Sequence, residues 1–176
     1  SMGVSQGVSA LVGQALGRGK PHDARAVAWS SAHLLLIYIL CVDMLFIFYP
    51  DKLLMLFIPH GQSEEEYRQI LFLAVPLLRI VSIYLIFDAM YMVFSGVLKG
   101  AGDTRFIMWC IGLASFFCMI APVYFGITYL SFTIGQAWYC VLVFIGTLFL
   151  IAAVRYRKGK WQRMLVIERD AVTIKG

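Results

Sequence analysis

The sequence predicts an all-α, polytopic membrane protein, a helical bundle made of the end of one helix and four complete transmembrane helices. Three observations support this prediction. Of the 176 residues, 61% are hydrophobic and 14% are charged, and the mean hydropathy is +0.80, whereas a soluble domain averages about 25% charged residues. The apolar residues gather in runs long enough to cross a hydrocarbon layer of ~30 Å. Basic and non-basic connections alternate between these runs.

The first apolar segment, residues 4–16, is too short to span a bilayer. It starts without a flanking region and stops at the glycine-rich turn GRGKP, residues 17–21. We therefore expect residues 1–17 to be the end of a truncated transmembrane helix in a longer protein. Small side chains that allow close contact with another helix recur every four residues, at Ser9, Gly13 and Gly17.

Four complete spans should follow, over about residues 23–49, 67–98, 106–125 and 132–154. Asp23 is the expected N-cap of the first span, and Asp103 or Thr104 that of the third. The second span is longer than one straight crossing, so it should tilt, kink at Pro76 or protrude from the membrane. We assign residues 158–176 to a basic tail.

Positive charge separates the two sides of the predicted bundle. Lysine and arginine lie in the first and third connections and in the tail, whereas the second connection is acidic on balance and the fourth carries no charge. The positive-inside rule then places the basic connections and the C-terminus in the cytoplasm. We expect an integral protein of a bacterial inner membrane, with the lipid bilayer as its first partner.

The second complete span carries one acidic side chain, Asp88. Counted back from Lys99, which marks the water boundary, a rise of ~1.5 Å per residue places Asp88 ~16 Å deep, near the middle of a ~30 Å layer. A carboxylate there costs at least ~2.5 kcal/mol, so an intramembrane acid is a functional hypothesis by default. Several polar or adaptable side chains share the helical stripe of Asp88 or adjoin it, namely Tyr84, Tyr91, Met92 and Ser95.

This stripe predicts one wall of a cavity. Asp88 would take up and release a cation, with the Tyr84 phenol helping to hold it. The remaining side chains of the stripe would line a substrate cavity with aromatic and thioether surface. The alternative is a carboxyl group that burial keeps protonated and that bonds a neighbouring helix for packing. We expect no cofactor besides the coupling ion, Na⁺ or H⁺, and no metal besides Na⁺ at Asp88.

Three further polar side chains lie within the predicted spans. Arg79 lies on the side of its helix opposite Asp88 and near the outer interface, where a long side chain can snorkel. Asp43 lies in the outer third of its span and either pairs with Arg79 or lines a water-filled vestibule. His33 lies deeper and either relays protons or is hydrogen-bonded for packing.

Other chemistries find little support in the sequence. The three histidines form no ligand cluster, and no CxxC pair occurs, so neither zinc nor a disulfide framework is expected. No nucleophile is paired with a base, which argues against an enzyme. The basic residues form no stripe with interleaved aromatic residues, so nucleic-acid binding is not expected. The cysteines lie inside apolar runs as structural thiols, at Cys41, Cys110, Cys118 and Cys140.

Three stretches, GVSALVGQALGRGKPHDAR, IFDAMYMVFSGVLKGAGDTR and RKGKW, resemble the multidrug and toxic compound extrusion (MATE) family of transporters. Members of this family have twelve helices in two six-helix lobes related by pseudo-symmetry. The resemblance covers nearly the whole chain and corresponds to the end of helix eight and helices nine to twelve. It implies that residues 18–157 are the four-helix part of the C-terminal lobe. The N-terminal lobe and the first helices of the C-terminal lobe would be missing partners.

The resemblance also implies a function. It suggests a fragment of a secondary active antiporter that exports small cationic or amphipathic compounds in exchange for Na⁺ or H⁺. Asp88 matches the acid of the family's tenth helix, and Tyr84 the tyrosine one turn earlier in members of the NorM type. Two alternatives stay open. One is a lipid-linked saccharide flippase of the same superfamily, which would need a wide cationic cavity where this chain supplies mainly Arg79. The other is a non-transporting membrane scaffold.

Overall fold

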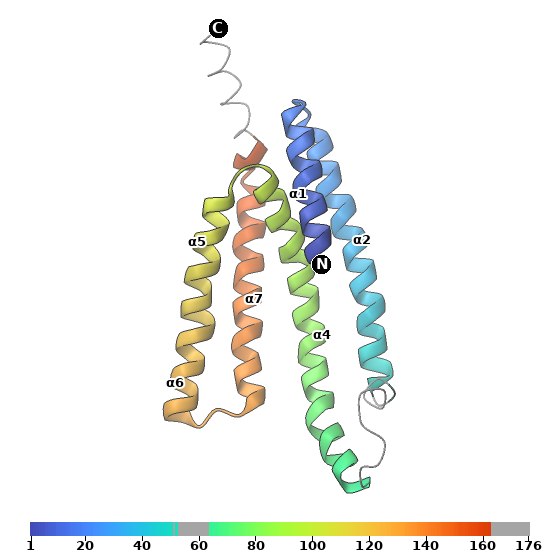
Figure 1. Ribbon diagram of the computed structural model, residues 1–176, viewed down its shortest axis with the longest axis vertical. Helices are drawn as coiled ribbons and strands as arrows, with labels where there is room; N and C mark the ends of the chain where they lie inside the picture. Colours follow the sequence, from blue (N-terminus) through green and yellow to red (C-terminus); the bar gives the residue numbers. More distant parts are fainter. Residues whose placement is uncertain (51, 53–63, 163–176) are drawn as a thin grey trace.

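The computed structural model describes residues 1–50, 52 and 64–162, and this part of the chain contains helices and turns but no strand (Figure 1). The prediction of an all-α fold is confirmed. In chain order the elements are α1 (Met2–Gly17), α2 (Pro21–Phe48), α4 (Glu64–Gly100), α5 (Thr104–Ala114), the π-helical segment η1 (Ser115–Ile120), α6 (Ala121–Leu130), α7 (Ile134–Arg157) and the 3-10 turn η2 (Lys160–Gln162).

In the described part of the chain, four helical stretches are long and apolar enough to cross a membrane, as predicted: Pro21–Phe48, Ala74–Gly100, Thr104–Tyr129 and Ile134–Arg157. Many large apolar side chains point outward from these stretches, for example Leu34 and Ile37 of α2 and Trp109 of α5. Such a surface is unfavourable in water but suits lipid tails, which are themselves apolar. The chain is therefore an integral membrane protein.

Two predicted helix bounds need correction. The helix α2 begins at Pro21 and not at Asp23, because proline is well suited to the first helical position, where its missing N–H costs no hydrogen bond. Asp23 lies in the first turn, with its carboxylate 4.0 Å from the Lys20 ammonium group. The third span does not end at Phe125, because the helix continues through η1 and α6 to Leu130.

The helix α4 is the centre of the bundle and packs against α1, α2, α5 and α7. Its 37 residues are about 55 Å long at ~1.5 Å per residue. Pro76 lies inside the helix without ending it. Figure 1 shows the N-terminal end of α4 reaching past the neighbouring helices, which agrees with the predicted protrusion.

Small residues allow α1 and α4 to approach closely. A Cβ atom added to Gly96 would lie 2.6 Å from the Ser5 carbonyl oxygen, and one added to Gly100 would meet the backbone of Ser9. A Cβ atom on Gly13 would lie 3.3 Å from the Gly100 carbonyl oxygen. The α1 stripe that contacts α4 is therefore Ser5, Ser9 and Gly13, one turn earlier than the predicted stripe that ended at Gly17.

The two glycine-rich turns stop their helices in the same way. After α1, the Lys20 N–H donates to the Ala15 carbonyl and the Gly19 N–H to the Leu16 carbonyl, both at 2.9 Å. After α4, the Asp103 N–H donates to Leu98 and the Gly102 N–H to Lys99. This is the Schellman arrangement, which needs a left-handed residue after the helix. Glycine supplies it in both turns, with φ of 73° at Gly19 and 89° at Gly102.

The connections alternate between the two ends of the bundle. Figure 1 shows the α1–α2 turn, the α4–α5 turn and η2 at one end, and the α6–α7 connection at the other. We call the first end, formed by residues 17–25, 99–105 and 155–162, the basic end, because each of its three parts carries lysine or arginine. The three basic parts therefore lie at one end and the uncharged α6–α7 connection at the other, as predicted, while most of the acidic second connection lies outside the described residues.

Candidate functional site

Asp88 lies about midway along the membrane-spanning part of α4, which extends from Ala74 to Gly100. Its carboxylate is half-buried and turns toward α1, where its Oδ2 atom accepts a hydrogen bond of 3.2 Å from the Ser1 hydroxyl. The half-buried Tyr84 side chain lies one turn earlier on the same helix. The fold thus keeps Asp88 and Tyr84 on one face of the central helix, and their depth in a membrane stays a prediction.

The other members of the predicted stripe lie in different surroundings. Tyr91 is 6% exposed and packs in the core between the helices, and Ser95 is fully buried, with its hydroxyl donating to the Met92 carbonyl at 3.5 Å. The Met92 side chain instead lines a cavity of about 360 Å³ between α1 and α4, together with Gln6 and Lys99. Because α1 packs onto the stripe, the cavity-lining role of Tyr91 and Ser95 stays a prediction.

A second acid lies on α2, where it faces α4. Asp43 and Ser82 are opposite each other and are only 3% and 4% exposed. The two side chains face each other without hydrogen-bond geometry, and none of their oxygen atoms has a partner in the described part of the chain. Buried polar groups are nearly always bonded, so an unpartnered carboxylate marks a position where water or an ion is needed.

Arg79 and His33 are the other two polar side chains that the sequence singles out within the predicted spans. Arg79 is exposed, and among residues 1–50, 52 and 64–162 it forms no ion pair with either acid. The pairing of Asp43 with Arg79 is therefore not observed. His33 is also exposed, and its Nδ1 atom lies 2.8 Å from the Trp29 carbonyl oxygen one turn earlier on the same helix, so both alternatives for His33 stay predictions.

An ion pair that sequence reasoning missed joins the basic end of the bundle. The Arg155 Nε atom donates to Asp103 Oδ2 at 2.8 Å, and the Arg155 guanidinium lies 4.5 Å from the centre of the Phe106 ring. Asp103 precedes α5 as its N-cap but bonds Arg155 with its side chain. The sequence did contain a signal for this pair: Asp103 and Arg155 have opposite charges, and the alternation of the spans brings both to the same end of the bundle.

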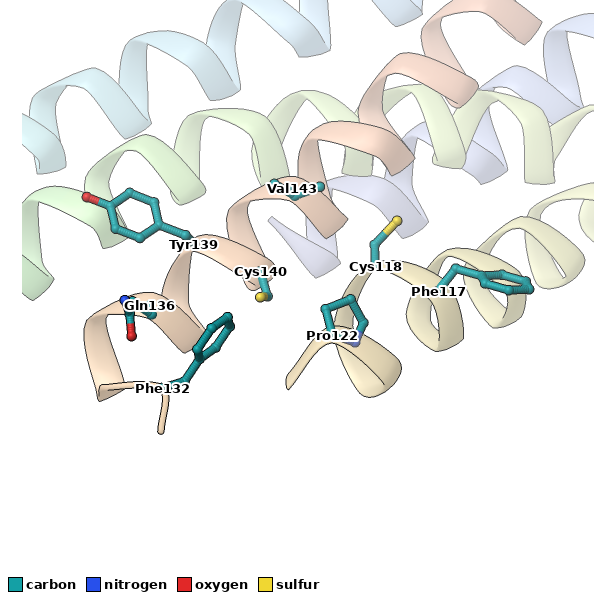
Figure 2. A pocket seen from close by; sticks show the side chains of 8 residues that line it. All are labelled: Phe117, Cys118, Pro122, Phe132, Gln136, Tyr139, Cys140 and Val143. Carbon is teal, nitrogen blue, oxygen red and sulfur yellow. The ribbon is translucent and has the colours of Figure 1, made fainter. Parts of the chain in front are cut away.

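A separate apolar cavity of about 410 Å³ lies between η1–α6 and the start of α7. Figure 2 shows Cys140 and Phe132 on one side of this cavity facing Cys118 and Pro122 on the other. Pro122 accounts for the π-helical segment before it, since proline lacks an N–H and its ring clashes with the carbonyl group one turn earlier. No charged side chain lines this cavity, so it does not belong to the Asp88 site.

The described residues contain no group of three or more histidine, cysteine, aspartate or glutamate side chains that could hold a metal ion. Within this part of the chain, a cation at Asp88 would find one carboxylate and the Tyr84 hydroxyl on the same helical face. Oxygen ligands of this kind suit a hard, weakly held cation or a proton better than a transition metal.

Comparison with known proteins identifies the family of this chain. A model of the MatE family matches residues 1–125, which include α1, α2, α4 and α5 with both glycine-rich turns and Asp88. The comparisons with curated proteins and with solved structures gave no match.

Proposed function

The chain belongs to the MatE family of membrane transporters, and we propose that it forms part of a secondary active antiporter. In this proposal the transporter exports cationic or amphipathic compounds in exchange for Na⁺ or H⁺, and Asp88 is the coupling carboxylate. On the positive-inside rule, we assign the basic end of the bundle to the cytoplasmic side of a bacterial inner membrane.

One observation carries the proposal: a half-buried carboxylate lies at the middle of the central membrane-spanning helix. A carboxylate at this depth costs at least ~2.5 kcal/mol, so such groups face the bundle interior or a water-filled cavity and serve ion or substrate pathways. Asp88 lies one turn before Met92 and two turns before Gly96, on the face of α4 that α1 approaches, which supports an orientation toward other helices. A scaffold protein would gain nothing from an acid in this position.

The mechanism that follows is alternating access with competition at the acid. A substrate cation binds most tightly when Asp88 carries its negative charge. A proton or Na⁺ that reaches Asp88 from the other side removes this charge and lowers the affinity for the substrate. By linkage, substrate and coupling ion weaken each other's binding by the same factor. Tyr84, one turn away, can donate its hydroxyl proton to the carboxylate or turn its oxygen to a bound Na⁺.

The proposal is tested by ion flux in liposomes that contain the full-length protein, of which we expect this chain to be the C-terminal part. Addition of ethidium, a fluorescent organic cation, should drive ion movement under a sodium gradient or a pH gradient, imposed separately. Replacing Asp88 by asparagine removes the charge at nearly constant volume, and exchange should fall to the level of empty liposomes. The control is Asp23→Asn, the same change at an exposed position of the basic end, which should keep the wild-type rate.

Efflux by Asp88→Asn at the wild-type rate, with normal insertion and folding, would contradict the coupling role. The same liposomes separate the flippase alternative. If an undecaprenyl-linked sugar crosses the membrane and ethidium drives no ion flux, the flippase is correct and the antiporter is not.

A further inference from the structure

A polar cavity of about 300 Å³ lies at the basic end, where α2 begins and α7 ends. It is separate from Asp88, which lies at the middle of its span. Because both helices are membrane spans, the cavity is placed at the level of the lipid headgroups. Side chains from three elements line it: Arg25 and Trp29 of α2, Tyr156 and Arg157 of α7, and Trp161 and Gln162 of η2.

The inner wall of this cavity is built by the chain folding back after α7. The turn at Gly159 brings Trp161 onto Tyr156, so that the two rings stack with centres 5.3 Å apart and an interplanar angle of 15°. The Trp161 Nε1–H donates to the Tyr156 carbonyl at 3.0 Å, and Trp161 is only 2% exposed. On its other side Tyr156 contacts Phe94 of α4, with ring centres 5.0 Å apart. The Tyr156 ring is therefore fixed in position by aromatic contacts on both sides.

The Tyr156 side chain has a polar group without a partner. Tyr156 is only 7% exposed, and its hydroxyl oxygen forms no hydrogen bond with any residue that the structure describes. The Arg25 guanidinium lies beside this hydroxyl without hydrogen-bond geometry. A buried hydroxyl without a partner is costly, so the cavity that it borders is expected to supply one.

The two arginines of the cavity are also without acidic partners. Arg25 and Arg157 are exposed and form no ion pair within residues 1–50, 52 and 64–162. Of the two acids described at the basic end, Asp103 is bonded to Arg155, and Asp23 is exposed with its carboxylate 4.0 Å from the Lys20 ammonium group. Among the described residues, the lining of the cavity thus presents two positive groups and one hydroxyl and no negative charge.

We propose that this cavity binds the phosphate headgroup of an anionic phospholipid from the adjoining leaflet. Guanidinium groups match the oxygens of a phosphate with paired hydrogen bonds, and the Tyr156 hydroxyl adds a further donor. Basic cavities between membrane helices at this level are suited to anionic headgroups. The exposed Trp29 indole at the rim favours a lipid over a soluble phosphate compound, because tryptophan prefers the membrane interface.

The test measures lipid binding by native mass spectrometry on the full-length protein in detergent. The probes are dioctanoyl phosphatidylglycerol and its phosphatidylcholine counterpart, which share acyl chains and differ in net charge. The wild type should bind the anionic lipid more tightly. Arg25→Gln combined with Arg157→Gln should weaken that binding by roughly 25-fold, from about fivefold for each arginine. Tyr156→Phe, which removes only the hydroxyl group, should weaken it by a few-fold.

The matched control is Arg18→Gln combined with Arg105→Gln. It removes the same charge from exposed positions of the same end that do not line the cavity, and it should change the affinity by less than about twofold. An equal loss in the control would overturn the proposal, since it would show diffuse attraction only. Equal binding of the two lipids, or no loss in Tyr156→Phe and the arginine pair, would also overturn it. If inorganic phosphate competed as strongly as the lipid, the result would overturn the lipid proposal and indicate a soluble phosphate compound as the ligand.

Discussion

The ion pair between Asp103 and Arg155 is expected to hold the basic end together. The two side chains are 9% and 22% exposed, and the bonded atoms are 2.8 Å apart. Hydrogen bonds to charged groups contribute about 1.5–3 kcal/mol, but partial exposure of Arg155 lowers this figure. Polar pairs between membrane helices average ~0.6 kcal/mol with a maximum near 1.7. We therefore expect a coupling energy of about 1 kcal/mol.

A double-mutant cycle measures this energy. The free energy of unfolding is determined by denaturant titration in detergent for the wild type, Asp103→Asn, Arg155→Gln and the double variant. Each change should destabilise the wild type by more than it destabilises the variant that already lacks the other charge. The control cycle is Lys20→Gln with Asp23→Asn, whose charged atoms are 4.0 Å apart with both side chains more than half exposed, and which should show no measurable coupling. A coupling at Asp103–Arg155 below ~0.3 kcal/mol, or equal to that of the control, would refute the reasoning.

Two further predictions concern glycines and use the same titration. Gly96→Ala should destabilise the protein by about 1–3 kcal/mol, because the new methyl group would meet the Ser5 backbone and force α1 away from α4. The control is Gly112→Ala on α5, where nothing lies within 4 Å of the added methyl group, and it should stabilise the protein slightly. If the two substitutions changed the free energy of unfolding equally, α1 and α4 would not be in close contact. Gly102→Ala should cost about 1–2 kcal/mol, since φ is 89° there. Gly17→Ala, at an open position without positive φ, is its control and should cost little.

The spans and their alternation could be predicted from the sequence because both depend on local composition. A run of apolar residues must satisfy its backbone within one helix in lipid, whatever its neighbours are. The stops at Gly19 and Gly102 could likewise be recognised as turns, since glycine adopts the left-handed conformation readily. The position of Asp88 midway along the apolar part of α4 follows from its distance in sequence to the α4–α5 turn, so this position could also be predicted.

The surroundings of each polar side chain could not be predicted, because they depend on which helix packs against which face. Helical spacing places Tyr91 and Ser95 near Asp88, but only the packing of several neighbouring helices decides that both are buried. Asp43 on α2 lies against Ser82 on α4, and because the two residues are far apart in the sequence, no local sequence pattern indicates this contact. The π-helical segment before Pro122 preserves the apolar pattern while shifting the register of the residues after it.

The position of Asp88 divides α4 into two parts that differ in packing. From Ala89 to Leu98 most side chains are buried, whereas among the described side chains from Ala74 to Asp88 only Ser82 is. The close contact of Gly96 with Ser5 fixes the buried part against α1. Packed interfaces resist continuous deformation, so a change of charge at Asp88 is expected to leave the part fixed against α1 in place. The part of α4 before Asp88 faces Asp43 through Ser82 and ends away from the basic end, which is the side from which the coupling ion enters in the proposed mechanism.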